Sequence, residues 1–128
     1  MKRITTTILI MAFIATGAPA LAALTAAERT VADYLAASKQ GNVKAVESMI
    51  CGPLLKKRAR LLSNPDYSAH LIEAYRNTRF GQPRETGGRQ GEQATVEVSI
   101  TFPGGEKVIR RYSLMKKGAY CIQAETGL

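Results

Sequence analysis

The sequence predicts an α+β fold in which N-terminal helices pack on a curved antiparallel sheet of three or four strands. Two observations predict it. From Ala94 to Phe102 apolar and polar side chains alternate, as is typical of a strand with one buried face. Upstream of it, residues 26–77 carry helical patterns, and this order of helices followed by strands favours α+β over alternating βαβ units.

The strand at 94–102 leads into a predicted hairpin. Pro103, Gly104 and Gly105 favour a tight reversal, and residues 106–115 are rich in β-branched and aromatic side chains. A second reversal at 116–118 precedes a short final strand. The remaining predicted strands are this final one at 119–124 and one irregular or edge strand at 78–85, in a polar stretch interrupted by glycines.

Four helices are predicted before the sheet. Thr25 and Glu28 stand at capping-box positions, so a helix should begin directly after Thr25, and Gly41 can end it. Asn42 can cap a second, short helix, and an Asn-Pro turn separates the last two. The predicted helices span 26–39, 43–50, 54–62 and 67–77.

The N-terminus has the three-part layout of a secretory signal. Lys2 and Arg3 precede an apolar run, and small residues with a proline follow it. We expect cleavage after Ala22, so that a signal peptide at 1–22 precedes one domain at 23–128. Removal of 22 residues from the 128-residue chain leaves 106, enough for a single core.

The alternative to cleavage is an uncleaved anchor. Residues 4–24 carry no charge and are long enough to span a bilayer, although threonines, a glycine and a proline weaken that interpretation. The first cysteine is Cys51, so a lipid-modified N-terminus is not expected. We therefore expect a periplasmic or secreted protein.

The chain is basic. It carries 18 Lys and Arg against 10 Asp and Glu, a net charge of +8; loss of Lys2 and Arg3 leaves 16 against 10, or +6. An exported basic domain meets anionic lipid, lipopolysaccharide, cell-wall polymer or acidic protein more often than nucleic acid. No aromatic residues interleave with the cations as in single-strand binders.

The densest group of cations lies in the third predicted helix. Such cations around most of a helix usually form a solvated face, but they could also dock on anionic lipid or polymer. The residues concerned are Lys56, Lys57, Arg58 and Arg60.

Cys51 and Cys121 are the two cysteines of the chain, and we expect them to pair in an oxidising compartment. The bridge would tie the helices to the last strand. If Tyr120 and Ile122 face the helices, Cys121 faces away, so Cys51 would have to lie at the rim of the sheet. Redox catalysis is disfavoured because the chain has no C-x-x-C pair.

The sequence offers no convincing catalytic group. His70 is the single histidine, so neither a metal set of the usual kind nor a Ser-His-Asp triad can be assembled. Asp33 and Asp66 fall beside a core position and at a helix cap. Glu97 lies on the polar side of its strand, and Glu92 and Glu106 lie at turns. We expect no catalytic residue, metal or cofactor.

Aromatic residues and one arginine could line a pocket. Arg110 breaks the apolar alternation of its strand and points either inward or to a rim. An inward guanidinium needs a carboxylate, from the protein or from a ligand. The aromatic residues either form the core, as a small domain requires, or line a pocket mouth: Tyr34, Tyr75, Tyr112, Tyr120, Phe80 and Phe102.

The stretches Tyr34–Val46, Ala94–Ile100 and Tyr112–Ile122 together resemble small exported proteins of the NTF2-like superfamily, in particular DUF4878-type domains. The resemblance implies an NTF2-like or cystatin-like cone over most of residues 26–123, and pairing of two copies through the open sheet. Asn42 stands where an Asp is usual and Tyr120 where a Trp is usual.

Two functions compete. The first is a non-catalytic exported module that binds an envelope protein or an anionic lipid or polymer surface. The second is a small-molecule carrier, or an isomerase-like enzyme, that uses the cone pocket. An open apolar pocket with one inward titratable group would favour the second function, and an interior filled by tyrosine and phenylalanine would favour the first.

Overall fold

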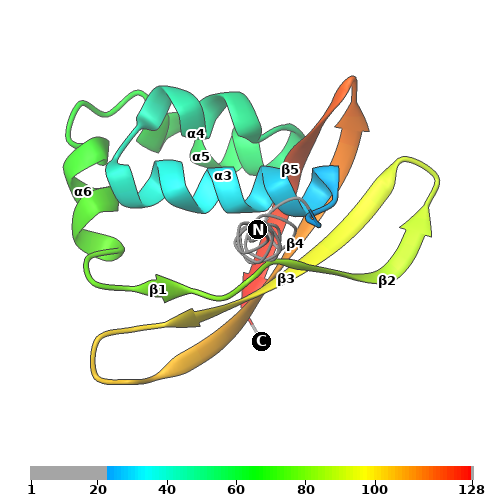
Figure 1. The fold of residues 1–128 in the computed structure, drawn as a ribbon. Helices are drawn as coiled ribbons and strands as arrows, with labels where there is room; N and C mark the ends of the chain where they lie inside the picture. The colour runs from blue at the N-terminus through cyan, green and yellow to red at the C-terminus, as the bar shows by residue number, and fades with distance from the viewer. Residues whose placement is uncertain (1–22, 128) are drawn as a thin grey trace, which may run out of the picture.

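The computed structural model describes residues 23–127, and it places four helices on one side of a strongly twisted sheet (Figure 1). This arrangement confirms the α+β class. The predicted signal peptide lies outside the described residues. The elements are α3 (Ala26–Gln40), α4 (Val43–Met49), α5 (Gly52–Leu62), α6 (Tyr67–Ala74), β1 (Arg79–Phe80), β2 (Arg84–Gln90), β3 (Gln93–Thr101), β4 (Lys107–Lys117) and β5 (Ala119–Gly127).

The sheet is antiparallel and open, with the order β1-β3-β4-β5. β2 also pairs with β3, so β1 and β2 share one edge of that strand. The prediction of one edge strand at 78–85, in a sheet of three or four strands, is therefore wrong. The described sheet has five strands, because two short strands occupy this edge. Pro83 lies in the gap between β1 and β2. Proline has no backbone N–H, so it cannot donate a hydrogen bond to a neighbouring strand.

Four helix boundaries also differ from the prediction, two of them by one residue: α3 ends at Gln40 instead of residue 39, and α4 ends at Met49 instead of residue 50. α5 begins at Gly52 instead of residue 54, because Pro53 falls in the first helical turn, where the missing N–H costs no hydrogen bond. α6 ends at Ala74 instead of residue 77. Asn77 has φ 58°, a left-handed conformation that cannot continue a helix.

The predicted start of α3 and its termination by Gly41 are confirmed. Thr25 and Glu28 form the capping box: the Glu28 N–H donates to Thr25 Oγ1 at 3.1 Å, and the Thr25 N–H donates to Glu28 Oε1 at 2.9 Å. Gly41 ends the helix at φ 72°, and a Cβ there would come within 2.8 Å of Ile72. Glycine is therefore required on both conformational and steric grounds.

The strand register fixes which side chains face the helices. The buried side chains of β3 are Ala94, Val96, Val98 and Ile100. Val98 pairs with Arg110 of β4, and Val96 pairs with Tyr112. Directly opposed residues of an antiparallel pair point to the same face, so Arg110 and Tyr112 face the helices. Arg111 faces the other side, where it meets Glu97 at 2.8 Å.

A β-bulge changes the alternation of β5. Ser113 pairs with Ala124, but the next residue, Leu114, pairs with Ile122, which leaves Gln123 as the extra residue. A bulge of this kind re-aims the side chains that follow it. Ala124 is consequently exposed, and Glu125, which pairs with Tyr112, turns toward the helices.

The disulfide between Cys51 and Cys121 is present, with Cα atoms 5.8 Å apart. It has the rim geometry that the sequence required. The Cys51 N–H donates to the Ile122 carbonyl at 2.9 Å, and Ile50 forms a parallel bridge with Ile122. The junction of α4 and α5 is thereby fixed along the outer edge of β5.

Candidate functional site

Six polar side chains converge between the helices and the sheet, and we call them the Arg–Tyr cluster. They come from α3, α5, β4, β5 and the residue that ends α6, so segments distant in sequence are needed to build it. The cluster consists of Arg58, Arg110, Tyr34, Tyr75, Tyr112 and Glu125.

Arg58 belongs to this cluster and not to an outer basic face. Leu54 is buried, and Arg58 follows it by four residues on the same side of α5. Its guanidinium forms an ion pair with Glu125 and donates to the Tyr34 hydroxyl at 2.5 Å. Both charged side chains are shielded, with exposures of 17% and 15%. Of the four predicted surface cations, Lys56, Lys57 and Arg60 are the exposed ones.

Tyr34 and Tyr112 fill the interior beside this ion pair. Both are fully buried, and their rings meet edge to face with centroids 6.0 Å apart. Burial raises the pKa of Tyr34 to about 12, although Arg58 acts in the opposite direction. Burial also raises the pKa of Tyr112, whose hydroxyl has no hydrogen-bond partner among the described residues. Both phenols therefore remain neutral at physiological pH.

Arg110 is the unmatched member of the cluster. It is half-buried, and its Nη1 donates a long hydrogen bond of 3.4 Å to the Tyr75 hydroxyl. Arg110 interacts electrostatically with Tyr112, but the two groups do not meet hydrogen-bond geometry. Among the ion pairs of residues 23–127, none includes Arg110. Its strong donors therefore lack a charged acceptor in the described structure.

The charges of the cluster do not cancel. Arg58 and Arg110 contribute two positive charges, Glu125 contributes one negative charge, and Glu125 is committed to Arg58. One positive charge is left beside Tyr75 and Tyr112. A singly charged anion with two or more acceptor atoms would complete the arrangement.

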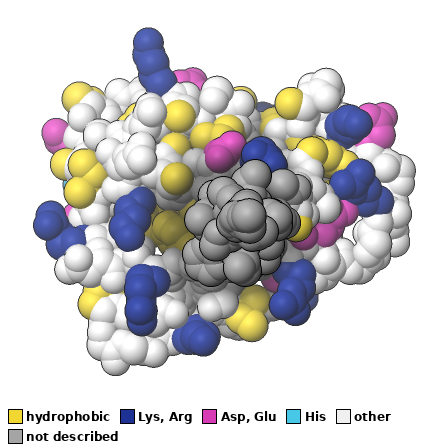
Figure 2. Space-filling model, viewed as in Figure 1, with side chains coloured by type: hydrophobic (Ala, Val, Ile, Leu, Met, Phe, Trp, Pro, Cys, Tyr) yellow, Lys and Arg dark blue, Asp and Glu magenta, His cyan; other side chains and the backbone are white. Residues whose placement is uncertain are grey.

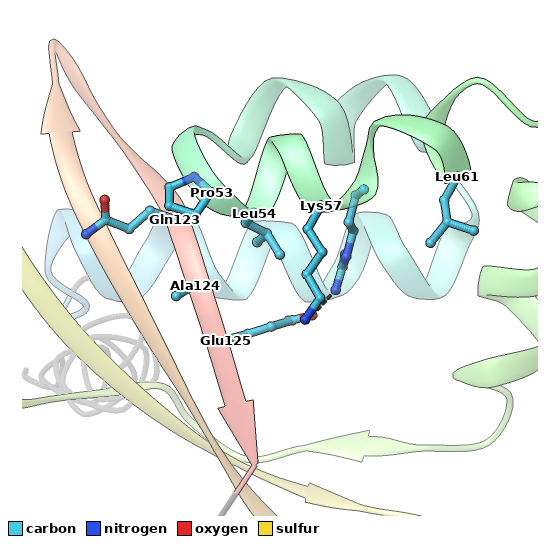
Figure 3. A pocket seen from close by; sticks show the side chains of 8 residues that line it. Pro53, Leu54, Lys57, Leu61, Gln123, Ala124 and Glu125 are labelled. Atoms are coloured by element: carbon cyan, nitrogen blue, oxygen red, sulfur yellow. Dashed lines mark ion pairs between the residues drawn. The ribbon is translucent and has the colours of Figure 1, made fainter.

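A groove of about 420 Å³ adjoins the cluster between α5 and β5. Figure 3 shows Lys57 extending from α5 toward Glu125, while Leu54 and Leu61 point in from the same helix. Glu125 Oε2 is buried and has no hydrogen-bond partner within the described residues. The groove is lined by Pro53, Leu54, Lys57, Arg58, Leu61, Gln123, Ala124 and Glu125.

The groups most often used in acid–base catalysis lie elsewhere. His70, Asp33 and Asp66 are exposed on or beside the helices. Residues 23–127 contain no group of three or more histidine, cysteine or acidic side chains able to hold a metal ion. In the same range, no helix is both long enough and apolar enough to cross a bilayer.

The predicted aromatic residues divide into two groups. Tyr34, Tyr112 and Tyr120 are buried, as the core interpretation expects. Tyr75, Phe80 and Phe102 are half-buried and pack against the same core. The hydroxyls of Tyr34 and Tyr75 nevertheless serve the arginines, so core packing and cluster formation use the same side chains.

The sequence interpretation missed Glu125. The predicted last strand ended at Ala124, and simple alternation from Tyr120 and Ile122 would send residue 125 outward. The bulge at Gln123 reverses that direction. For Arg58 a signal existed, because it follows the apolar Leu54 by four residues.

Comparison of the chain with protein-family models, with curated proteins and with solved structures finds no match. The features of this chain that bear on function are the Arg–Tyr cluster and the charged surface. Figure 2 shows Lys and Arg side chains distributed over the visible face, with fewer acidic groups between them.

The buried Tyr34 makes stability sensitive to alkaline pH. Its folded pKa of about 12 lies above the ordinary value of 10. Its contribution is therefore fully present below pH 10 and is lost between pH 10 and about 12, as the unfolded phenol ionises first. Between pH 9 and pH 11 we expect Tyr34→Phe to lose less stability than the wild type, by about 1 kcal/mol. Urea unfolding at pH 9 and pH 11 measures it, and equal losses in both proteins would contradict it.

Proposed function

We propose that this chain is an exported, non-catalytic binding module of the NTF2-like kind, and that it recognises an anionic group at Arg110. The observation that carries the proposal is the inward guanidinium of Arg110, which has no carboxylate partner among the described residues. Placing an arginine on the buried face of a sheet is costly unless a charged acceptor meets it. A ligand is the missing acceptor.

The chemistry of the site favours an oxyanion. A guanidinium presents paired donors that match a carboxylate or a phosphate, and the Tyr112 hydroxyl beside it has no other partner in the described structure. Tyr75 supplies a second hydroxyl at 3.4 Å from Arg110. The ligand class is therefore an oxyanion, a carboxylate or a phosphate.

The same residues disfavour catalysis. Glu125 is engaged by the guanidinium of Arg58, so its charge already has a partner within the protein. Tyr34 and Tyr112 have raised pKa values, so neither supplies a phenolate near neutral pH. Tyr34 and Tyr112 are fully buried, which supports the interpretation that tyrosines form the core.

Export is supported by two features. The N-terminal layout, with Lys2 and Arg3 before an apolar run, is that of a secretory signal. Both cysteines of the chain are paired with each other, and such bonds persist in oxidising compartments. Together they favour the periplasm or the exterior as the location of the binding module.

The proposed site can be tested with benzoate as the probe and benzamide as its neutral isostere. We expect benzoate, and not benzamide, to shift the NMR signals of Arg110 Nε–H and of the Tyr75 and Tyr112 rings. Replacing Arg110 with Gln should weaken benzoate binding roughly 10- to 100-fold, because a charge-assisted contact is lost.

Arg111→Gln is the matched control, since Arg111 is the adjacent residue on the opposite face and is paired with Glu97. It should leave benzoate affinity unchanged. Equal weakening of benzoate binding by both substitutions would show that net charge, and not the position of Arg110, determines the affinity. Equal shifts by benzamide would show that Arg110 does not select an anion.

A second candidate function is docking on an anionic envelope surface. The observation that favours it is the exposure of Lys56, Lys57 and Arg60 together on α5. Each such cation contributes about 1 kcal/mol near an anionic membrane. Arg58 is excluded from this surface by its ion pair with Glu125.

Vesicle sedimentation tests the docking surface. We expect binding to phosphatidylglycerol vesicles and not to phosphatidylcholine vesicles, with loss of binding between 0.1 M and 1 M salt as the Debye length falls from about 10 Å to about 3 Å. The triple variant Lys56→Gln, Lys57→Gln, Arg60→Gln should not bind. Binding that survives the triple substitution or 1 M salt would show that these residues only form a solvated helix face.

A further inference from the structure

The outer edge of β5 is open over its second half. At Ile122 this edge is occupied, because Cys51 donates to the Ile122 carbonyl, and the disulfide fixes the α4–α5 junction beside it. Beyond Ile122, the described structure contains no backbone hydrogen bond to this edge from another segment. Residues Gln123–Gly127 therefore present an unpaired strand edge.

The opposite edge of the sheet is protected by other means. β2 has an irregular register between Thr86 and Gln90, and Gly87 and Gly88 both have positive φ. Arg89 and Glu85 add a surface ion pair. Bulges, glycines and charges of this kind discourage strand addition. The open segment of β5 has a bulge at Gln123 and an inward-turned Glu125, but within the described structure it carries no glycine with positive φ and no ion pair on its outer edge.

The open edge of β5 is also one wall of the groove beside α5. Opposite it stand Leu54 and Leu61, of which Leu61 is 44% exposed. Lys57 supplies a positive charge to the groove, while the charge of Glu125 is paired with Arg58. An occupant must therefore bring apolar side chains and an anionic side chain.

We propose that an extended, acidic segment of a protein partner adds to the edge of β5 in this groove. Strand addition supplies backbone hydrogen bonds, and alternate side chains then reach the two sides of the added strand. Its apolar side chains lie against Leu54 and Leu61, an acidic side chain meets Lys57, and its backbone pairs with that of Gln123–Gly127.

A second copy of this chain fits the groove less well. Pairing of two β5 edges would bring the α5 helices of both copies toward each other. Lys56, Lys57 and Arg60 would then face like charges, which opposes association. Charge complementarity selects an acidic partner instead.

This inference is independent of anion recognition at Arg110, since Arg110 does not line the groove. An Arg110→Gln variant should bind the acidic segment normally. The two proposals therefore fail separately.

Three synthetic peptides test the proposal: the alternating peptide Glu-Val-Glu-Val-Glu-Val-Glu, its counterpart with Lys in place of Glu, and an acidic version N-methylated at alternate residues. We expect only the unmethylated acidic peptide to shift the backbone amide signals of Gln123–Thr126 and slow their hydrogen exchange. N-methylation removes the donors that strand addition needs, and lysine removes the charge match.

Lys57→Glu and Lys56→Glu form the matched pair of variants, because both lie on α5 but only Lys57 lines the groove. We expect Lys57→Glu to weaken binding about tenfold, since an attraction becomes a repulsion, and Lys56→Glu to leave it nearly unchanged. Equal weakening of peptide binding by both variants would overturn the proposal, because it would show general charge attraction and not binding in the groove. Binding of the methylated peptide, absence of shifts at millimolar peptide, or concentration-dependent dimers through β5 would each overturn the proposal.

Discussion

Replacing Glu125 with Ala is expected to lower the free energy of unfolding by about 3 kcal/mol. The substitution leaves the guanidinium of Arg58 unpaired in a shielded position between α5 and β5. Removing one partner of a buried pair costs about 3 to 5 kcal/mol, and partial exposure of both side chains places this pair at the lower end. Urea unfolding monitored by circular dichroism measures the change.

Glu97→Ala provides the control for this substitution. Glu97 pairs with Arg111 on the outer face, where the arginine side chain is about half exposed. Its loss should cost less than about 1 kcal/mol, as for other surface pairs. Adding Arg58→Met to the Glu125→Ala variant should recover part of the stability, because no uncompensated charge remains. Similar small losses of stability in the Glu125→Ala and Glu97→Ala variants would show that the Arg58–Glu125 pair contributes no more than a surface ion pair.

Loss of the disulfide is expected to cost about 4 kcal/mol. The bond joins Cys51 and Cys121 across a sequence separation of 70 residues, and closing a loop of this length restricts the unfolded chain strongly. The double variant Cys51→Ala, Cys121→Ala and the reduced wild type should lose similar amounts in guanidinium unfolding.

Non-reducing mass spectrometry of a tryptic digest should show the peptides containing Cys51 and Cys121 linked. Two thiols freely alkylated in the native, oxidised protein would contradict the bond. If reduction lowers the free energy of unfolding by less than about 1 kcal/mol, packing alone holds the α4–α5 junction against β5.

Much of the fold follows from local patterns in the sequence. The alternation through Ala94–Phe102 predicts β3 and its buried face, because a period of two residues can bury only one side of a strand. Thr25, Glu28 and Gly41 predict both ends of α3 through cap chemistry that needs no tertiary contact. The orientation of Arg110 could not be predicted without the pairing register between β3 and β4, which the sequence does not determine.

The remaining features depend on long-range contacts. The inward turn of Glu125 results from the bulge at Gln123, and a bulge leaves no residue-type signal there. The break between β1 and β2 falls at residues 81–83, and local sequence does not predict that the segments on both sides of it pair with β3. In the sequence the four cations of α5 cannot be told apart. Arg58 nevertheless points into the Arg–Tyr cluster, because it contacts Tyr34 and Glu125 there.

A crystal structure of the protein with 4-bromobenzoate would show directly whether Arg110 holds an anion. The bromine supplies an anomalous signal that locates the probe without reference to the protein density. We expect the carboxylate within about 4 Å of the Arg110 guanidinium, the distance of an ion pair, with its oxygens toward the Tyr75 and Tyr112 hydroxyls. Bromine found only beside exposed lysines, or a protein carboxylate already paired with Arg110, would contradict anion recognition at this site.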